Sequence, residues 1–407
     1  MVFMCQNDSF LKEFTSKTVS CTKAQLLTHI DGKEHFLDGF DAIFEDTILF
    51  PEGGGQPSDH GFANESKVLH VKRVGDKAVH FIDKSLTVGD DVKQIVDWER
   101  RFDHMQQHSG QHLISAIIER DFGFDTVSWY LGEQVSYIEL DTPQFDLKQI
   151  EDTERKANEY IRAALKVYVE VFKSREEIKD TDISGLPDDH VGDIRVVKID
   201  GIDNNKCCGT HVTNLSQLQA VKFLGTEKSK RKNQILVNFL VGNRILQRLD
   251  ACLNREQQLT VLLKNNAVDH PNLVDKLVKN TKTLTKDIQS VLKELVVFEV
   301  EKFKAIVPQP TYYILHRKEA DSDFLQSFIK GIGISETLFF LSVGDDKAIG
   351  NIMMRGNENI VQELSNKVLE LLDGKGVVKK NCLNAKVANM KGRTKVAGFL
   401  KEYFKKP

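Results

Sequence analysis

The sequence predicts an α+β protein of several domains. Its 407 residues are enough for two to four domains. Hydrophobic residues make up 41% and charged residues 28%, which is ordinary for a soluble globular protein with a large core. Short strand-like runs separated by turn signals fill the first quarter, and later segments alternate helical and strand patterns. We expect a β-barrel-like domain at 1–95, an α+β domain at 96–245, a helical hairpin or coiled coil at 246–306 and a small α/β domain at 307–407.

Cysteine usage and apolar content indicate where such a chain works. Six cysteines are present, and only Cys207 and Cys208 are close together. This pattern suits a reducing compartment and a metal-binding or free-thiol role rather than a disulfide framework. No apolar run is long enough for a transmembrane helix, and the first residues are neither a signal peptide nor an Arg-rich transit peptide. We therefore expect a cytoplasmic protein without a membrane partner.

Charge is distributed unevenly along the chain. The net charge of −3 combines +9 within residues 374–407 with −12 over the remainder. A basic tail on an acidic body is typical of a nucleic-acid-binding protein. The alternative is a solvated and partly disordered tail. The charge distribution alone supports a nucleic-acid-binding tail and a disordered tail about equally.

Residues 1–95 read as mostly β-structure. The runs 46–50 and 68–74 have strand character, and small barrels show this pattern. Between them lie three successive glycines, Gly53, Gly54 and Gly55, which allow unusual dihedral angles and close backbone approach. A Walker phosphate loop is excluded because no Lys and no helix follow. A functional loop and a flexible hairpin both remain open.

Residues 96–245 combine helices with strands. Asp97–Arg100 leads into a histidine-rich helix, in which Gly110 costs about 1 kcal/mol relative to Ala. A close approach by substrate or by another backbone would explain this glycine. The other elements are a helix at 146–165, a short helix beginning at Ser174, a loop at 185–190, a basic loop at 226–232, and strands at 135–140, 167–172, 194–199, 218–224 and 234–240.

The remainder of the chain begins with a long helical region. An apolar stripe continues to about residue 304, with a break near 269–271. Beyond Pro308 the pattern alternates strands at 312–315, 338–341 and 349–354 with helices at 322–329 and 358–372, followed by the basic tail.

Two short motifs together offer a metal-ligand set. Residues four apart share a helix face, so His104, His108 and His112 form one stripe. Cys207 and His211 place a thiol and an imidazole at the same spacing, and this combination favours zinc over magnesium or calcium. Judged by spacing alone, His104 could be a ligand in place of His108 or His112, and Cys208 could be a ligand in place of Cys207. Histidine pairs also occur as ordinary core or surface residues, so each motif by itself is weak evidence.

Four protein ligands usually indicate a closed, structural zinc site, whereas catalytic sites keep one position open. The Gly-rich loop, Gly110 and the polar residues around the histidines favour a small polar ligand near the metal. No Glu lies within the HxxxH pattern, which excludes the HExxH peptidases.

These motifs carry a resemblance to a known family. The chain resembles the long form of the AlaX-type alanyl-tRNA editing proteins, and it is similar to the editing half of alanyl-tRNA synthetase. The resemblance covers roughly residues 1–245, and the C-terminal part more loosely resembles the C-terminal domain of that synthetase. The matching segments are 50–56 (FPEGGGQ), 108–112 (HSGQH), 194–197 (IRVV) and 207–212 (CCGTHV).

The resemblance implies one Zn²⁺ per chain, bound by His108, His112, Cys207 and His211. It also implies an activity: hydrolysis, in trans, of serine or glycine wrongly attached to tRNA(Ala). Two departures are Cys208, where synthetases usually carry Gly, and the lysine-rich segment from Lys375 onward.

Roles for further residues follow from the chemistry of ester hydrolysis. A developing oxyanion needs hydrogen-bond donors, and a serine hydroxyl needs a polar partner. The acceptor stem of a tRNA needs basic residues, because double-stranded RNA is recognised mainly through its backbone. We expect the oxyanion to be stabilised by Gln107, Gln111 and Gly53–Gly55. We expect the serine hydroxyl to be bound by Thr47, Thr126 or Ser128. We expect the tRNA to be bound by Lys228, Lys230, Arg231, Lys232, Lys379 and Lys380.

Other functions stay open at this point. A structural zinc in a non-catalytic tRNA-binding adaptor fits the same residues, and so does editing of another tRNA such as tRNA(Thr). The C-terminal region is expected to bind tRNA or to form a homodimer. A complete synthetase is excluded, because no segment resembles an ATP-binding aminoacylation core.

Overall fold

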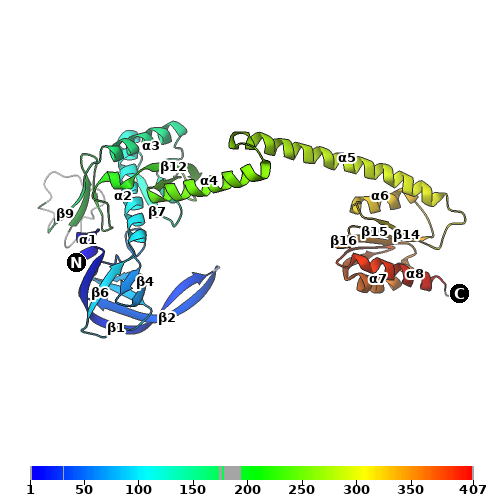
Figure 1. Cartoon of the computed structure of the whole chain (residues 1–407), viewed down its shortest axis with the longest axis horizontal. Coiled ribbons are helices and arrows are strands. Elements are labelled where there is room, and N and C mark those ends of the chain that lie inside the picture. Colours follow the sequence, from blue (N-terminus) through cyan, green and yellow to red (C-terminus); the bar gives the residue numbers. More distant parts are fainter. Residues whose placement is uncertain (1, 31, 174–176, 178–193, 406–407) are drawn as a thin grey trace. The chain divides into compact units, whose positions relative to one another are not determined.

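The computed structural model describes residues 2–30, 32–173, 177 and 194–405 (Figure 1). The short helix expected to begin at Ser174 and the loop expected at 185–190 lie outside these residues. The chain divides into two compact units, Met1–Gln258 and Leu259–Pro407. Helices and sheets of both pairing types are present, which confirms the α+β class.

A six-stranded barrel forms the N-terminal part of the first unit. Its strands pair in the order β1-β2-β5-β4-β3-β6, and β6 pairs back with β1 to close the sheet. A core of apolar side chains including Ile48, Leu49 and Val71 fills it. The elements are α1 (Met4–Asn7), β1 (Glu13–Ile30), β2 (Lys33–Phe44), β3 (Gly61–Ala63), β4 (Ser66–Val74), β5 (Lys77–Ile82) and β6 (Asp91–Val96).

The strand predicted at 46–50 is wrong. Residues 47–50 are buried, but none of the residues 46–50 belongs to a strand. The Ile48 N–H donates to the side chain of Gln94, and the Leu49 N–H donates to the hydroxyl of Thr47, at 3.1 and 3.0 Å. Because side chains satisfy these backbone groups, the segment needs no neighbouring strand.

Helix α2 (Trp98–Phe122) is the central element of the first unit, with the barrel at its N-terminal end and α3 beside its other end (Figure 1). Two sheets flank it, in the orders β11-β10-β9 and β12-β13-β8-β7. The elements are β7 (Thr126–Leu131), β8 (Ser136–Leu140), α3 (Leu147–Arg162), β9 (Val167–Phe172), β10 (Ile194–Ile199), β11 (Asp203–Lys206), η2 (Leu215–Leu218), β12 (Val221–Lys228) and β13 (Ile235–Val241).

Local sequence signals determine the ends and the packing of α2. The side chain of Asp97 caps its first turn by accepting a hydrogen bond from the Arg100 N–H. Gly123 ends it in the left-handed conformation, with φ 68°. A Cβ on Gly110 would lie 2.5 Å from the Val241 side chain on β13. The glycine therefore admits a neighbouring strand rather than a substrate.

Two long helices follow β13: α4 (Asn243–Leu263) and, after η3 (Ala267–Asp269), α5 (His270–Lys304). The helical region therefore breaks at 264–269, slightly earlier than expected. Apolar side chains of both helices, including Leu246 and Leu284, are more than half exposed. A packed helical hairpin or coiled coil stays a prediction.

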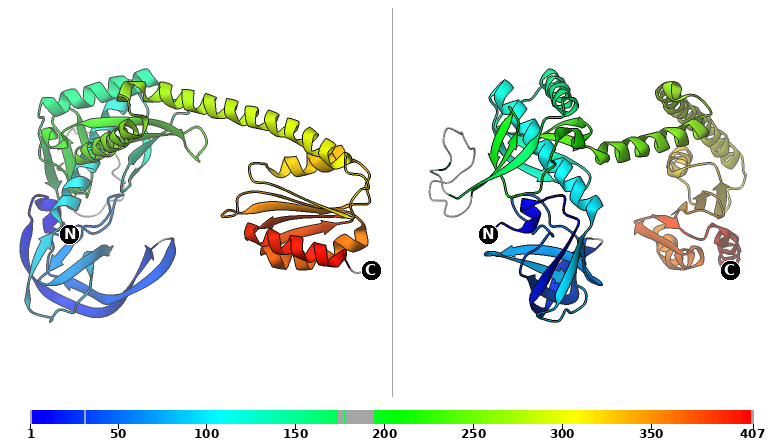
Figure 2. Two further views of the ribbon diagram at one scale, coloured as in Figure 1. Left: turned by 45° about the vertical axis from the view of Figure 1, so that its right-hand side comes forward. Right: turned by 60° about the vertical axis from the view of Figure 1, so that its left-hand side comes forward.

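The second unit contains a five-stranded mixed sheet in the order β14-β15-β16-β18-β17, in which β14 and β15 are parallel. Helix α6 lies on one face, and α7 and α8 lie on the other (Figure 2). The elements are β14 (Tyr312–Arg317), α6 (Ser322–Ile332), β15 (Leu338–Val343), β16 (Gly350–Arg355), α7 (Glu358–Leu372), β17 (Gly374–Lys379), β18 (Cys382–Val387), η4 (Met390–Gly392) and α8 (Arg393–Tyr403).

The basic tail is part of this fold. Residues 374–387 form the β17–β18 hairpin, and Leu383, Val396 and Leu400 are fully buried in the core beneath it. The alternative of a partly disordered tail is therefore wrong for residues 374–405. None of the helices in the described part of the chain is long and apolar enough to span a membrane.

Candidate metal centre

Four side chains of the metal-ligand type converge in the first unit. His108 and His112 lie one turn apart on α2, and Cys207 and His211 lie in the loop after β11. All four are buried, and their ligand atoms lie within 4.8 Å of one another. The sulfur of Cys207 lies 3.2 Å from Nε2 of His211 and 3.5 Å from Nε2 of His108. This arrangement can hold one metal ion.

Each histidine of the cluster has a partner on its other ring nitrogen. Nδ1 of His108 lies 2.9 Å from Oε1 of Gln56, and Nδ1 of His211 lies 3.0 Å from Oγ of Ser109. Nδ1 of His112 lies 3.2 Å from a carboxylate oxygen of Asp203. These contacts orient the rings and leave Nε2 for the centre, as is usual for metal-binding histidines.

The electrostatics of the cluster favour a thiolate. Burial would raise the pKa of Cys207, but the imidazoles of His108 and His211 hold it well below its ordinary value. Burial would lower the pKa of His112, but hydrogen bonds with Asp203 and Cys207 raise it to about 10. A metal ion bound here would therefore displace a proton from His112.

The structure shows whether His104 and Cys208, which spacing left open as alternative ligands, belong to the cluster. His104 lies one turn before His108, outside the cluster, and burial lowers its pKa to about 3. It lines a different cavity, which also contains Pro57 and Arg244. Cys208 is exposed, and its carbonyl accepts a hydrogen bond from Gln6. Cys207 is thus the thiol of the cluster.

A cavity of about 980 Å³ opens onto the cluster. Its walls come from the barrel, α2, β7 and the segment around Cys207. Among the residues predicted from the sequence, Gly53, Gly54, Gln111 and Thr126 line this cavity. Its other lining residues include Gln6, Phe50, Glu52, Ser115, Trp129 and Asn205.

The three glycines form a tight turn at the edge of this cavity. Gly53 and Gln56 exchange backbone hydrogen bonds of 3.2 and 3.1 Å across Gly54 and Gly55. Both central residues have positive φ, 57° and 82°, which suits a two-residue hairpin turn. A Cβ on Gly55 would also overlap the indole of Trp129 at 2.7 Å. These conformations explain the run of glycines.

The predicted polar residues have different surroundings. Gln111 donates to Ser115, which contacts Thr126, at 2.9 and 2.7 Å. Gln107 is buried away from the cavity and bonds both backbone groups of Val241.

Two hydroxyls predicted to contact substrate have other partners. The hydroxyl of Thr47 lies inside the barrel, between His80 and Gln94. The hydroxyl of Ser128 donates to Glu139. Neither residue is among those that line the cavity.

The predicted basic residues are exposed. Lys228 ends β12, and Lys230, Arg231 and Lys232 lie in the following loop, where Arg231 contacts Glu139 at 3.2 Å. In the second unit, a cavity of about 730 Å³ is lined by Lys379 and Lys380 together with Lys330 and Arg355. No acidic residue is among the described residues lining it.

Sequence reasoning missed the partners of the ligand histidines. Gln56 could have been suspected from its place directly after the glycines. Ser109 lies within the HSGQH motif, but its pairing with His211, 102 residues away, carried no local signal, and neither did the pairing of Asp203 with His112, 91 residues away.

Comparison with known proteins identifies the family. A family model described as "Threonyl and Alanyl tRNA synthetase second additional domain" matches residues 194–237, which include Cys207 and His211. The alanyl-tRNA editing protein Aarsd1 of Danio rerio is 45% identical over 403 residues, covering 99% of this chain and 98% of the relative. This chain belongs to the alanyl-tRNA editing protein family.

Other members of the family match over different lengths. The Mus musculus alanyl-tRNA editing protein Aarsd1 is 45% identical over 405 residues, covering 99% of this chain and 98% of the relative. AlaX-M of Methanosarcina barkeri, also named an alanyl-tRNA editing protein, is 30% identical over 214 residues, covering 49% of this chain and 88% of its own. The resemblance described from the motifs is thus confirmed.

Proposed function

We propose that this chain is a zinc-dependent aminoacyl-tRNA hydrolase that releases serine, or glycine, from mischarged tRNA(Ala) in trans. The observation that carries the proposal is the buried His₃Cys cluster at the wall of a large cavity, in a member of the alanyl-tRNA editing family. Three imidazole nitrogens and one thiolate suit zinc better than a hard cation. When bound, zinc polarises a carbonyl or lowers the pKa of a water molecule.

The reaction is a simple ester hydrolysis. The oxygen of water bonds to the ester carbonyl carbon, and the bond from that carbon to the ribose oxygen breaks. The ribose oxygen leaves with a proton, so the products are the free amino acid and a tRNA with a free terminal hydroxyl. An aminoacyl ester is already activated, and the protein therefore has to bind, orient and stabilise rather than supply a strong nucleophile.

We assign stabilisation of the developing oxyanion to the Gly-rich turn and to Gln111. The Gly53 N–H already donates to Gln56, so the N–H groups of Gly54 and Gly55 are the donors we assign from the turn. Gln111 lines the cavity from α2 and supplies a side-chain amide. Gln107 would have to release Val241 to act in the same way.

Discrimination against alanine requires a partner for the serine hydroxyl, because a site built to bond a hydroxyl rejects an analogue that lacks one. Thr126 is the candidate that lines the cavity, and its hydroxyl belongs to a chain with Ser115 and Gln111. Thr47 and Ser128 could bond the serine hydroxyl only if their own hydroxyls left their present partners, which include His80 for Thr47 and Glu139 for Ser128.

A second candidate function follows from the ligand count. Four protein ligands are typical of structural zinc, which favours a non-catalytic tRNA-binding adaptor as the competitor. The family model also names threonyl-tRNA synthetase, so tRNA(Thr) is the competing substrate.

The test is release of amino acid by the purified full chain from Ser-tRNA(Ala), Gly-tRNA(Ala) and Ser-tRNA(Thr), with zinc content measured in parallel. We expect one zinc per chain, rapid deacylation of tRNA(Ala) substrates, and loss of activity with a chelator. The variant His108→Ala/Cys207→Ala should lose both zinc and activity, because it removes two of four ligands.

His104→Ala is the matched control, because it removes a histidine from the same helix that lies outside the cluster. It should keep both zinc and activity. Stoichiometric zinc without deacylation of any substrate would favour the adaptor. Full activity of the folded double variant would overturn the zinc assignment.

A further inference from the structure

We propose that Gln56 is a positioning residue for the metal centre: its side chain fixes the tautomer and orientation of His108. The proposal rests on the metal site of the proposed function. Gln56 is fully buried, and it is the residue through which the Gly-rich turn of the barrel reaches both metal-ligand segments.

The contacts of Gln56 determine which way its amide points. The Thr210 N–H, which can only donate, lies 3.0 Å from Oε1 of Gln56, and Nε2 of Gln56 donates to the hydroxyl of Thr210 at 2.8 Å. Oε1 also faces Nδ1 of His108 at 2.9 Å. An amide oxygen can only accept, so Nδ1 of His108 carries the proton.

A proton on Nδ1 leaves the lone pair on Nε2, the nitrogen that faces the sulfur of Cys207. One amide thus orients His108 on α2 and Thr210 next to His211. Gly209 makes this approach feasible, because a Cβ there would overlap both the imidazole of His108 and Oε1 of Gln56.

The loop that carries Gln56 is anchored at its base on the same helix. Asp59 and Phe50 exchange hydrogen bonds, from the Asp59 N–H to the Phe50 carbonyl and from the Phe50 N–H to the carboxylate, at 3.0 and 2.6 Å. Arg101, on α2 two turns before His108, donates to that carboxylate from Nε at 2.9 Å. Both side chains are completely buried.

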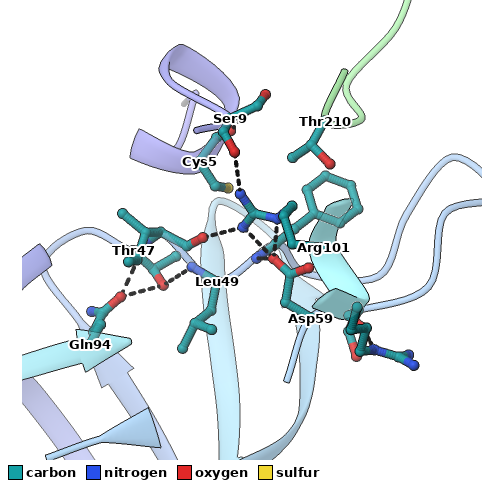
Figure 3. Close-up of polar contacts among 12 residues, drawn as sticks. Cys5, Ser9, Thr47, Leu49, Asp59, Gln94, Arg101 and Thr210 are labelled. Carbon is teal, nitrogen blue, oxygen red and sulfur yellow. Dashed lines mark hydrogen bonds and ion pairs between the residues drawn. The ribbon is translucent and has the colours of Figure 1, made fainter. Parts of the chain in front are cut away.

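Arg101 also joins the loop to the segment after α1. Figure 3 shows its guanidinium between Asp59 and the Ser9 carbonyl, to which Nη1 donates at 2.9 Å. Its Nη2 donates to the Ile48 carbonyl, just before the loop. The Gly-rich turn is therefore attached to α2 at two points, by Arg101 at its base and by Gln56 near its tip.

This double attachment links the cavity wall to the ligand set. Gly53 and Gly54 line the cavity, while Gln56, directly beyond the turn, holds a ligand imidazole. Loss of the Gln56 amide should therefore loosen the ligand before it changes the rest of the fold.

The experiment measures zinc affinity of the full chain by competition with a chromophoric chelator, for wild type and Gln56→Met. Methionine keeps the length of the side chain but cannot accept from Nδ1. Loss of such an outer partner typically lowers metal affinity roughly 10–100-fold, and we expect a decrease in this range. Gln56→Glu, which still offers an oxygen to Nδ1, should restore affinity close to wild type.

Gln106→Met is the matched control for a merely structural role. Gln106 is also a fully buried glutamine, on α2, but it bonds the Gln217 carbonyl and the Asn243 N–H instead of a ligand. It should lose stability without losing zinc affinity. The absorption spectrum of the Co²⁺-substituted proteins gives a second readout, and the visible bands should change for Gln56→Met only.

The outcomes separate this inference from the proposed function. Equal zinc affinity and equal Co²⁺ spectra for Gln56→Met and Gln106→Met would overturn the inference and leave the metal site in place. A wild-type chain that binds no zinc would overturn the proposed metal site and the inference with it.

Discussion

His80 is a fully buried histidine inside the barrel, away from the metal centre. Its Nε2 lies 2.9 Å from the hydroxyl of Thr47, and its Nδ1 lies 3.2 Å from the carbonyl of Ala42. Burial lowers its pKa to about 4, from an ordinary value of 6.5. The imidazole is therefore neutral in the folded protein under conditions where the unfolded chain would bind a proton.

This difference predicts a pH-dependent loss of stability. Above pH 6.5 neither state is protonated at His80, and below that value only the unfolded state takes up a proton until about pH 4. Stability therefore falls as the pH falls through this window, by about 2 kcal/mol between pH 7 and pH 5. In the variant His80→Gln, the side chain can still form hydrogen bonds but does not titrate. The variant should therefore lack this part of the loss of stability between pH 7 and pH 5.

Urea unfolding at pH 7 and pH 5 measures the effect as a difference between wild type and His80→Gln. Any titration of the His/Cys cluster is common to both proteins and cancels in the difference, because distant sites contribute additively. An identical pH dependence for the two proteins would contradict the assignment to His80.

At the scale of elements, the buried pair Arg101–Asp59 joins α2 to the barrel. Removing one partner of a buried ion pair leaves an uncompensated charge, which typically costs about 3–5 kcal/mol. We expect Arg101→Met to lower the free energy of unfolding by this amount, measured by urea denaturation with zinc present.

The double variant Arg101→Met/Asp59→Asn removes the orphaned charge as well. It should therefore be more stable than Arg101→Met, although the contacts of the guanidinium with Ser9 and Ile48 stay lost. A double variant that is less stable than the single variant would show that the pair does not act as an ion pair.

At the scale of the whole molecule, the basic C-terminal segment is folded, and its charges have defined positions. Lys379 and Lys380 lie at the turn of the β17–β18 hairpin and line a cavity with Lys330 and Arg355. A cavity with four cationic side chains suits a phosphate backbone, and we propose that it contributes to tRNA binding. A homodimer through this region is the competing proposal, and sedimentation of the free chain distinguishes it.

Lys379→Ala/Lys380→Ala should weaken tRNA binding and flatten its salt dependence, by about one unit of log–log slope for each lysine that contacts a phosphate. Lys375→Ala/Lys386→Ala is the matched control, because these paired residues carry the same charge on the same hairpin but do not line the cavity. Fluorescence anisotropy of tRNA(Ala) at several salt concentrations measures both. Equal losses for the two variants would indicate a diffuse charge effect instead of a defined site.

The sequence by itself determined the local features of this protein. Helical spacing was enough to place His108 and His112 on one face, and turn and apolar patterns located most strands and helices, because both depend on residues only a few positions apart. The resemblance in the short motifs then singled out Cys207 and His211 as the remaining candidate ligands, and the structure brings all four side chains together.

Only the tertiary structure decided which distant groups surround those ligands. Gln56, Ser109 and Asp203 reach their histidine partners across 52, 102 and 91 residues, and no local pattern encodes such contacts. The segment 46–50 looked like a strand because burial and apolar composition do not reveal that side chains satisfy its backbone. Charge alone left a nucleic-acid-binding tail and a partly disordered tail equally open, because the apolar residues of this segment find their partners in a core shared with earlier strands and helices.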